Sequence, residues 1–133
     1  MSSGKIMVVD DSGMSRRSLK RILESANYEV IEADDGMAAL EQYFLEKPVL
    51  VMLDMLMKGM YGLEVLSKLL EMDKDARVVI VSADIQNSTR EMAKEAGALE
   101  FINKPFAADS VLNIVTRILS EETLANGIDR EAE

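Results

Sequence analysis

Charged and polar side chains follow short apolar runs at several points along the chain. Asp10 and Asp11 come directly after IMVV, Asp54 follows VLVML, and Lys104 follows LEFIN. A hydroxyl, that of Ser82, ends a further run, RVVIV. Three carboxylates held close together repel one another and stay ionised only beside a cation. Because all their ligand atoms are oxygens, Mg²⁺ is the expected ion, with Mn²⁺ as the alternative.

The same side chains suit the transfer of a phosphoryl group. An aspartate can accept the group and become an aspartyl phosphate. Catalysis then needs little beyond positioning, the charge of the metal and donors aimed at the transferring oxygens. Ser82 can donate to one such oxygen, and Lys104 can pair with another. Read alone, Asp11 and Ser12 could instead cap a following helix, but a cap does not explain two acids beside a third.

These residues meet only if the elements that precede them lie side by side. Apolar runs alternate with stretches of helical periodicity, and the runs are Lys5–Val9, Tyr28–Glu32, Val49–Leu53, Arg77–Val81 and Leu99–Asn103. Strict alternation predicts an α/β fold with a parallel sheet covered by helices on both faces. Ligands of such sheets bind outside the carboxyl ends of the strands, which is where the chemical residues stand. Gly97 is the expected C-terminal cap of the fourth helix.

Composition limits the possible functions. The 133 residues, 48% of them hydrophobic, predict one folded domain over residues 1–121, followed by an acidic tail or linker over 122–133. A net charge of −9 argues against direct binding of nucleic acid, and no apolar run is long enough to span a membrane. The chain has no cysteine, which fits a cytoplasmic protein. It has no histidine either, which excludes histidine catalysis and phosphohistidine within the chain.

Four motifs follow one another along the chain: IMVVDDS, LDMLMKGMYGLEVL, VIVSAD and EAGALEFINKPF. Together they resemble the receiver domain of two-component response regulators over about residues 5–120, of the chemotaxis-regulator type in which the receiver stands alone. The resemblance implies a doubly wound, five-stranded parallel sheet of flavodoxin-like order 2-1-3-4-5. It also implies that Asp54 is the phosphoacceptor. Mg²⁺ would be held by Asp11, Asp54 and the backbone carbonyl of Leu56, and by Asp10 through water.

Further roles follow from the same resemblance. Ser82 matches the hydroxyl of the family's switch, Lys104 its lysine, Phe101 its aromatic switch position and Pro105 its cis-proline. A phosphoryl group would draw Ser82 inward and vacate space for the Phe101 ring, whose preference packing alone would set. The surface from Asp84 to Asp109 would then change.

Partners are implied in the same way. A histidine kinase or a histidine phosphotransfer protein would supply the phosphoryl group, and a downstream protein would read the changed surface. The domain would catalyse only its own phosphorylation and dephosphorylation, as a monomer or as a dimer that forms on phosphorylation.

Three positions depart from the family pattern. Lys58 stands where the family usually has proline, Tyr61-Gly62 stands where Asp-Gly is common, and Phe101 lacks the hydroxyl of the commoner tyrosine. These departures bear on the rigidity and charge of the loop after Asp54 and on any hydrogen-bonded lock at the aromatic position. They leave the acceptor, the acid pair and the lysine unchanged.

Three other functions compete with a signalling receiver. A flavodoxin-like cofactor binder needs a phosphate loop rich in Ser, Thr and Gly after the first strand, whereas this chain has DDSGMS there. A metal-dependent phosphohydrolase carries an Asp-x-Asp pair on that strand, and this chain has adjacent aspartates. A receiver-like scaffold that no longer turns over phosphate would not need the complete set of acids, hydroxyl and lysine.

Overall fold

The fold is described by a computed structural model that covers residues 4–83 and 86–132, with only the backbone described for Asn87 and for 121–132. Asp84, the first residue of the expected output surface, lies outside the described residues. The strands are β1 (Lys5–Val9), β2 (Glu29–Ala33), β3 (Leu50–Leu53), β4 (Val78–Ser82) and β5 (Glu100–Asn103). The helices are α1 (Gly13–Ser25), α2 (Gly36–Glu46), α3 (Gly62–Met72), α4 (Asn87–Glu95) and α5 (Ala108–Ala132).

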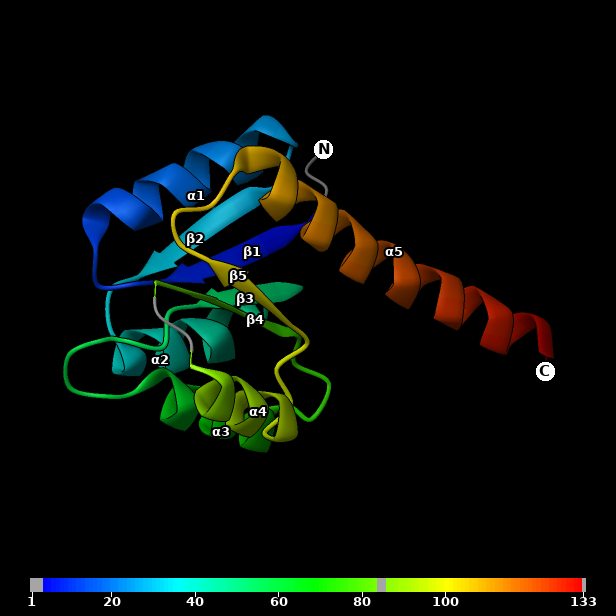
Figure 1. Cartoon of the computed structure of the whole chain (residues 1–133). Coiled ribbons are helices and arrows are strands. Elements are labelled where there is room, and N and C mark those ends of the chain that lie inside the picture. The colour runs from blue at the N-terminus through cyan, green and yellow to red at the C-terminus, as the bar shows by residue number, and fades with distance from the viewer. Residues whose placement is uncertain (1–3, 84–85, 133) are drawn as a thin grey trace.

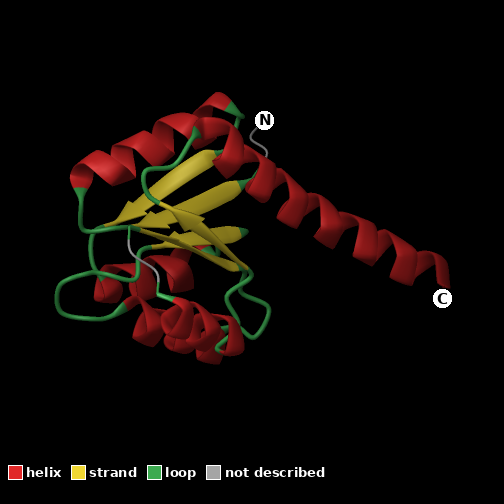
Figure 2. Cartoon of the chain, in the orientation of Figure 1, coloured by secondary structure: helices red, strands yellow, loops and turns green. Residues whose placement is uncertain are grey.

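All strand pairs are parallel, and the sheet has the order β2-β1-β3-β4-β5. This order confirms the one implied by the resemblance. Figure 1 shows α1 and α5 on one face of the sheet and α2, α3 and α4 on the other. The three layers are plain in Figure 2, where the strands form the middle layer. Strand and helix alternate without exception along the described chain, as the sequence predicts.

Each face of the sheet has its own hydrophobic core, because successive side chains of a strand point to opposite faces. In β1, Met7 and Val9 belong to the core under α2, α3 and α4, while Ile6 and Val8 belong to the core under α1 and α5. These four side chains are at most 1% exposed. A strand buried on both faces reads as a continuous apolar run, which explains the pattern IMVV.

Four strands begin one residue later than the sequence suggests. The turn after α1 gives one physical reason: Asn27 has a φ of 70°. The N–H of Tyr28 still donates to the carbonyl of Leu23, so β2 begins only at Glu29. Gly97 follows the C-cap of α4 with a φ of 112°, a conformation that suits glycine and agrees with its predicted capping role.

Helix α5 packs on the sheet through Val111, Val115 and Ile118. Its backbone stays helical to Ala132, and the end of the helix extends away from the sheet in Figure 1. The division between domain and tail near residue 121 stays a prediction. Within the described residues, no helix combines the length and the hydropathy that crossing a membrane requires.

Candidate functional site

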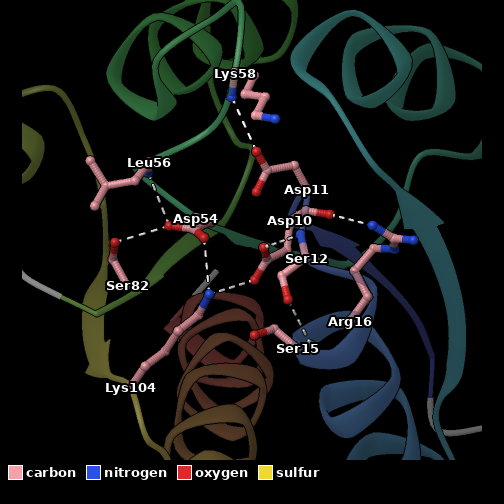
Figure 3. A network of polar contacts seen from close by, with 10 residues as sticks. All are labelled: Asp10, Asp11, Ser12, Ser15, Arg16, Asp54, Leu56, Lys58, Ser82 and Lys104. Carbon is pink, nitrogen blue, oxygen red and sulfur yellow. Dashed lines mark hydrogen bonds and ion pairs between the residues drawn. The ribbon is translucent and has the colours of Figure 1, made fainter.

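The carboxyl ends of four strands bring the predicted residues together. Asp10 directly follows β1, Asp54 follows β3, Ser82 is the last residue of β4, and Lys104 follows β5. Figure 3 shows these side chains converging on one another. Although polar, Asp10, Asp54 and Ser82 are 2%, 6% and 0% exposed, so each needs a partner within the protein.

Asp54 receives hydrogen bonds on both of its carboxylate oxygens. The Ser82 hydroxyl donates to Oδ1 over 2.9 Å, and the backbone N–H of Leu56 donates to the same oxygen over 3.0 Å. The Lys104 ammonium donates to Oδ2 over 2.9 Å. A carboxylate buried and bonded in this way has a fixed orientation, which is what an acceptor group needs.

Lys104 also links Asp54 to Asp10, because its ammonium lies 2.7 Å from Asp10 Oδ2. Burial raises the pKa of the Asp10 carboxyl, and the Lys104 hydrogen bond offsets only part of that rise. Burial by itself lowers the pKa of Lys104, but its hydrogen bonds to Asp10 and Asp54 outweigh burial and raise it. Lys104 therefore stays charged and acts as the internal cation of the site.

The two adjacent aspartates have different surroundings. Asp10 Oδ1 accepts the N–H of Ser12 over 2.9 Å. Ser12 is the N-cap of α1, and its hydroxyl accepts the N–H of Ser15 over 3.3 Å. Asp11 is exposed, and its Oδ2 accepts the backbone N–H of Lys58 over 3.2 Å. Because Ser12 caps the helix, the capping explanation accounts for the serine and leaves the acidic pair unexplained.

Asp10, Asp11 and Asp54 fit a divalent cation. Each offers a carboxylate oxygen, and these oxygens lie within 4.8 Å of one another. Mg²⁺ prefers such oxygen donors and usually keeps several waters when only one or two carboxylates bind it directly. The backbone carbonyl of Leu56 as a further ligand, and a water between Asp10 and the metal, stay predictions.

Phe101 and Pro105 lie on the elements that the resemblance implies. The Lys104–Pro105 peptide bond is cis, the isomer expected at this position. Phe101 is half-buried in β5, and its backbone partner in β4 is Ile80, two residues before Ser82. The roles of both residues in transmitting a signal stay predictions.

Sequence reasoning missed three contacts around the site. The Arg16 guanidinium donates to the Asp10 carbonyl over 2.6 Å. The Arg90 guanidinium lies 5.3 Å from the centre of the Phe101 ring. The N–H of Lys58 reaches Asp11, and the lack of proline at this position is the one sequence signal that could have indicated it.

Comparisons with known proteins agree with the geometry. Residues 6–116 match the family model described as the response regulator receiver domain. Chemotaxis protein CheY of Bacillus subtilis is 38% identical over 117 residues, which cover 87% of this chain and 98% of that protein. Sporulation initiation phosphotransferase F of the same organism is 34% identical over 119 residues, covering 90% and 96% of the two chains.

Solved structures have the same fold. A chain from the CheX–CheY–BeF3–Mg²⁺ complex of Borrelia burgdorferi is similar with a TM-score of 0.83 and 32% identity, over 86% of this chain and 88% of that one. NtrX from Brucella abortus gives a TM-score of 0.89 and 30% identity over 97% of this chain, which spans only 30% of the NtrX chain.

Proposed function

This chain belongs to the response regulator receiver domain family, and on that premise we propose that Asp54 accepts a phosphoryl group in a Mg²⁺-dependent reaction. The chain has no histidine, so a phosphohistidine donor must belong to a partner. That donor is a histidine kinase or a histidine phosphotransfer protein. The observation that carries the proposal is the arrangement around Asp54. Its buried carboxylate accepts bonds from Ser82 and Lys104, and two further carboxylates offer oxygens within 4.8 Å.

The transfer exchanges one bond to phosphorus for another. The bond to the donor's histidine nitrogen breaks while a bond to an Asp54 carboxylate oxygen forms, so the phosphoryl group moves without a cofactor being consumed. Mg²⁺, when bound by the acidic cluster, reduces the repulsion between the acceptor carboxylate and the incoming phosphoryl oxygens. Ser82 and Lys104 already direct their donors at the two Asp54 oxygens, so they can bond the phosphoryl oxygens that arrive there.

The output would pass through β4 and β5. Ser82 pairs in register with Asn103, and Phe101 precedes Asn103 by two residues, so movement of the Ser82 hydroxyl towards a phosphoryl group reaches Phe101 through adjacent strands. The described part of the expected surface, residues 86–109, comprises α4, β5 and the start of α5. We propose that a downstream protein binds this surface and that the domain, monomeric or dimeric on phosphorylation, acts in the cytoplasm.

Labelling with a small phosphodonor tests the acceptor. Acetyl phosphate with Mg²⁺ should add one phosphoryl group that is stable in mild acid and labile in base to the parent protein, and EDTA should prevent its addition. Asp54→Asn should abolish labelling, because the amide is not a nucleophile here. Asp75→Asn is the matched control. This exposed aspartate lies between α3 and β4, at the amino-terminal end of β4 and so away from the site, and its variant should label normally.

Two outcomes would contradict the assignment. Labelling that persists in Asp54→Asn would move the acceptor to another residue. A protein that takes up no label under any Mg²⁺ concentration would instead be the receiver-like scaffold without phosphate turnover.

A further inference from the structure

Asp11 differs from the other two acids of the site in how it is held. Lys104 bonds Asp10 and Asp54, and Ser12 bonds Asp10 as well. Among the described residues, the donor to the Asp11 carboxylate is the backbone N–H of Lys58, over 3.2 Å to Oδ2. Figure 3 shows Lys58 reaching Asp11 from the opposite side to Lys104. Asp11 is therefore held from the loop between β3 and α3.

That loop is fixed to the core on both sides of Lys58. Met55 and Met57 are each 6% exposed and belong to the core under α2, α3 and α4. The N–H of Gly62, the first residue of α3, donates to the Met55 carbonyl over 3.0 Å. Because Met57 immediately precedes Lys58 and is buried, the Lys58 N–H has a defined position before any ion arrives.

Without this donor, an exposed Asp11 carboxylate would turn away from two like charges nearby. Rotation about its side-chain bonds costs little, and each turn outward removes one oxygen from the cluster. Carboxylates that bind metals are commonly oriented by hydrogen bonds from neighbouring groups, and losing such a neighbour typically weakens metal binding. The Lys58 N–H opposes the outward turn.

We propose that Lys58 is a positioning residue whose backbone N–H holds the Asp11 carboxylate ready for Mg²⁺. The inference rests on the proposed function, since it assigns Asp11 to the metal. It does not extend to family members with the usual proline at this position, because proline has no N–H to donate. The loop that carries Asp54 thereby also orients a ligand that follows β1.

Two substitutions separate the N–H from the side chain. Lys58→Ala keeps the N–H and removes only the ammonium, while Lys58→Pro removes both. Proline is the family's usual residue here, so the backbone conformation is expected to accept it. Mg²⁺ is titrated into each variant, with amide chemical shifts as the readout. We expect the dissociation constant of Lys58→Pro to be about fivefold higher than that of Lys58→Ala, the effect of losing one ordinary hydrogen bond. Equal or tighter binding by the proline variant would overturn the proposal.

A metal-free measurement excludes an effect of proline on the loop alone. The unfolding equilibrium is measured in urea with EDTA for Lys58→Ala and Lys58→Pro, each in the parent and in an Asp11→Ala background. The ratio of the folding equilibrium constants of Lys58→Ala and Lys58→Pro is compared between the two backgrounds. If the hydrogen bond exists, this ratio should be about threefold larger when Asp11 is present than in the Asp11→Ala background. An equal loss in both backgrounds would mean that proline acts on the loop and not on Asp11.

Neither measurement uses a phosphoryl donor. If labelling placed the acceptor elsewhere than Asp54, the proposed function would fail while the comparison of the two Lys58 variants still stood. If the parent protein bound no Mg²⁺, the metal assignment would fail, and the metal-free cycle would still decide whether Lys58 holds Asp11.

Discussion

A single ammonium links carboxylates that follow two different strands. Lys104 lies 2.7 Å from Asp10 and 2.9 Å from Asp54, and its side chain is only 16% exposed. The single Lys104 charge therefore offsets one of the two negative charges without a metal, and burial still raises the pKa of Asp10. Removing one partner of a buried ion pair leaves the other charge uncompensated, which costs more than the pair itself contributes.

Lys104→Met should therefore destabilise the metal-free protein at pH 7, by about 1–3 kcal/mol because the pair is only partly buried. Loss of the Lys104 bond raises the pKa of Asp10 further. A carboxyl with a raised pKa favours folding while protonated, and that stability disappears as the pH rises through the raised value. The deficit of the variant should thus shrink as the pH falls towards the ordinary carboxyl pKa of 3.8.

Urea unfolding with EDTA, between pH 7 and about pH 4, measures this deficit. Lys20→Met is the control, because Lys20 pairs with Glu32 over 3.6 Å at the surface, and such exposed pairs contribute little. A deficit that did not change with pH, or that matched the control, would contradict the role of Lys104 as internal cation.

Between elements, α4 contacts β5 through an arginine and an aromatic ring. Arg90 lies over the Phe101 ring at 5.3 Å, a distance typical of a cation–π interaction. Its Nε is buried and has no hydrogen-bond partner among the described residues. The sequence predicted that packing alone sets the position of Phe101, and the structure adds this electrostatic contact. Arg90 thus stabilises the ring where it now lies and opposes its rotation.

Arg90→Met should release the ring, since methionine keeps much of the length but not the charge. Beryllofluoride with Mg²⁺ imitates the phosphoryl group, and amide shifts over residues 86–109 report the response. We expect the variant to reach half of its response at a concentration about twofold to fivefold lower than the parent. Arg90→Lys keeps the charge and should lie between the two. A variant that needs more beryllofluoride than the parent would show that Arg90 supports the changed state instead.

Contacts between residues that follow strand ends could be predicted from the sequence. Contacts that depend on the path of a loop or the orientation of a helix could not. Asp54, Ser82 and Lys104 could be predicted to meet, because parallel strands end at one edge of a sheet. The N–H of Lys58 could not, since every residue except proline has one and only the loop's path aims it. Arg90 could not either, because the ring it covers lies 11 residues further along the chain, on another element.

In the whole molecule, two cores share one sheet, and α5 completes one of them. Val111, Val115 and Ile118 are 0%, 0% and 8% exposed and lie beside α1. These residues lie within the first half of α5, which continues to Ala132. That the part of α5 required by the fold ends at residue 121 stays a prediction.

Truncation tests this boundary. A chain that ends at residue 121 should unfold at the same urea concentration as the parent and bind Mg²⁺ equally well. A control chain that ends at residue 110 lacks the buried side chains of Val111, Val115 and Ile118. Each should cost about 2–5 kcal/mol of the free energy of unfolding, and together they approach the whole stability of a small domain, so this chain should not fold. A lower midpoint for the longer truncated chain would mean that residues 122–133 are part of the domain.

The position of Lys104 in the chain also bears on how the protein is made. Its partners Asp10 and Asp54 precede it by 94 and 50 residues, so the ribosome delivers the acids long before the ammonium. A nascent chain that ends before β5 carries these carboxylates without their cation and cannot complete the sheet. Once β5 and Lys104 emerge, the chain itself supplies one positive charge between the two carboxylates. The sheet is thus completed only with its last strand. If the proposed function holds, a cell short of magnesium would contain folded protein that could not accept the phosphoryl group.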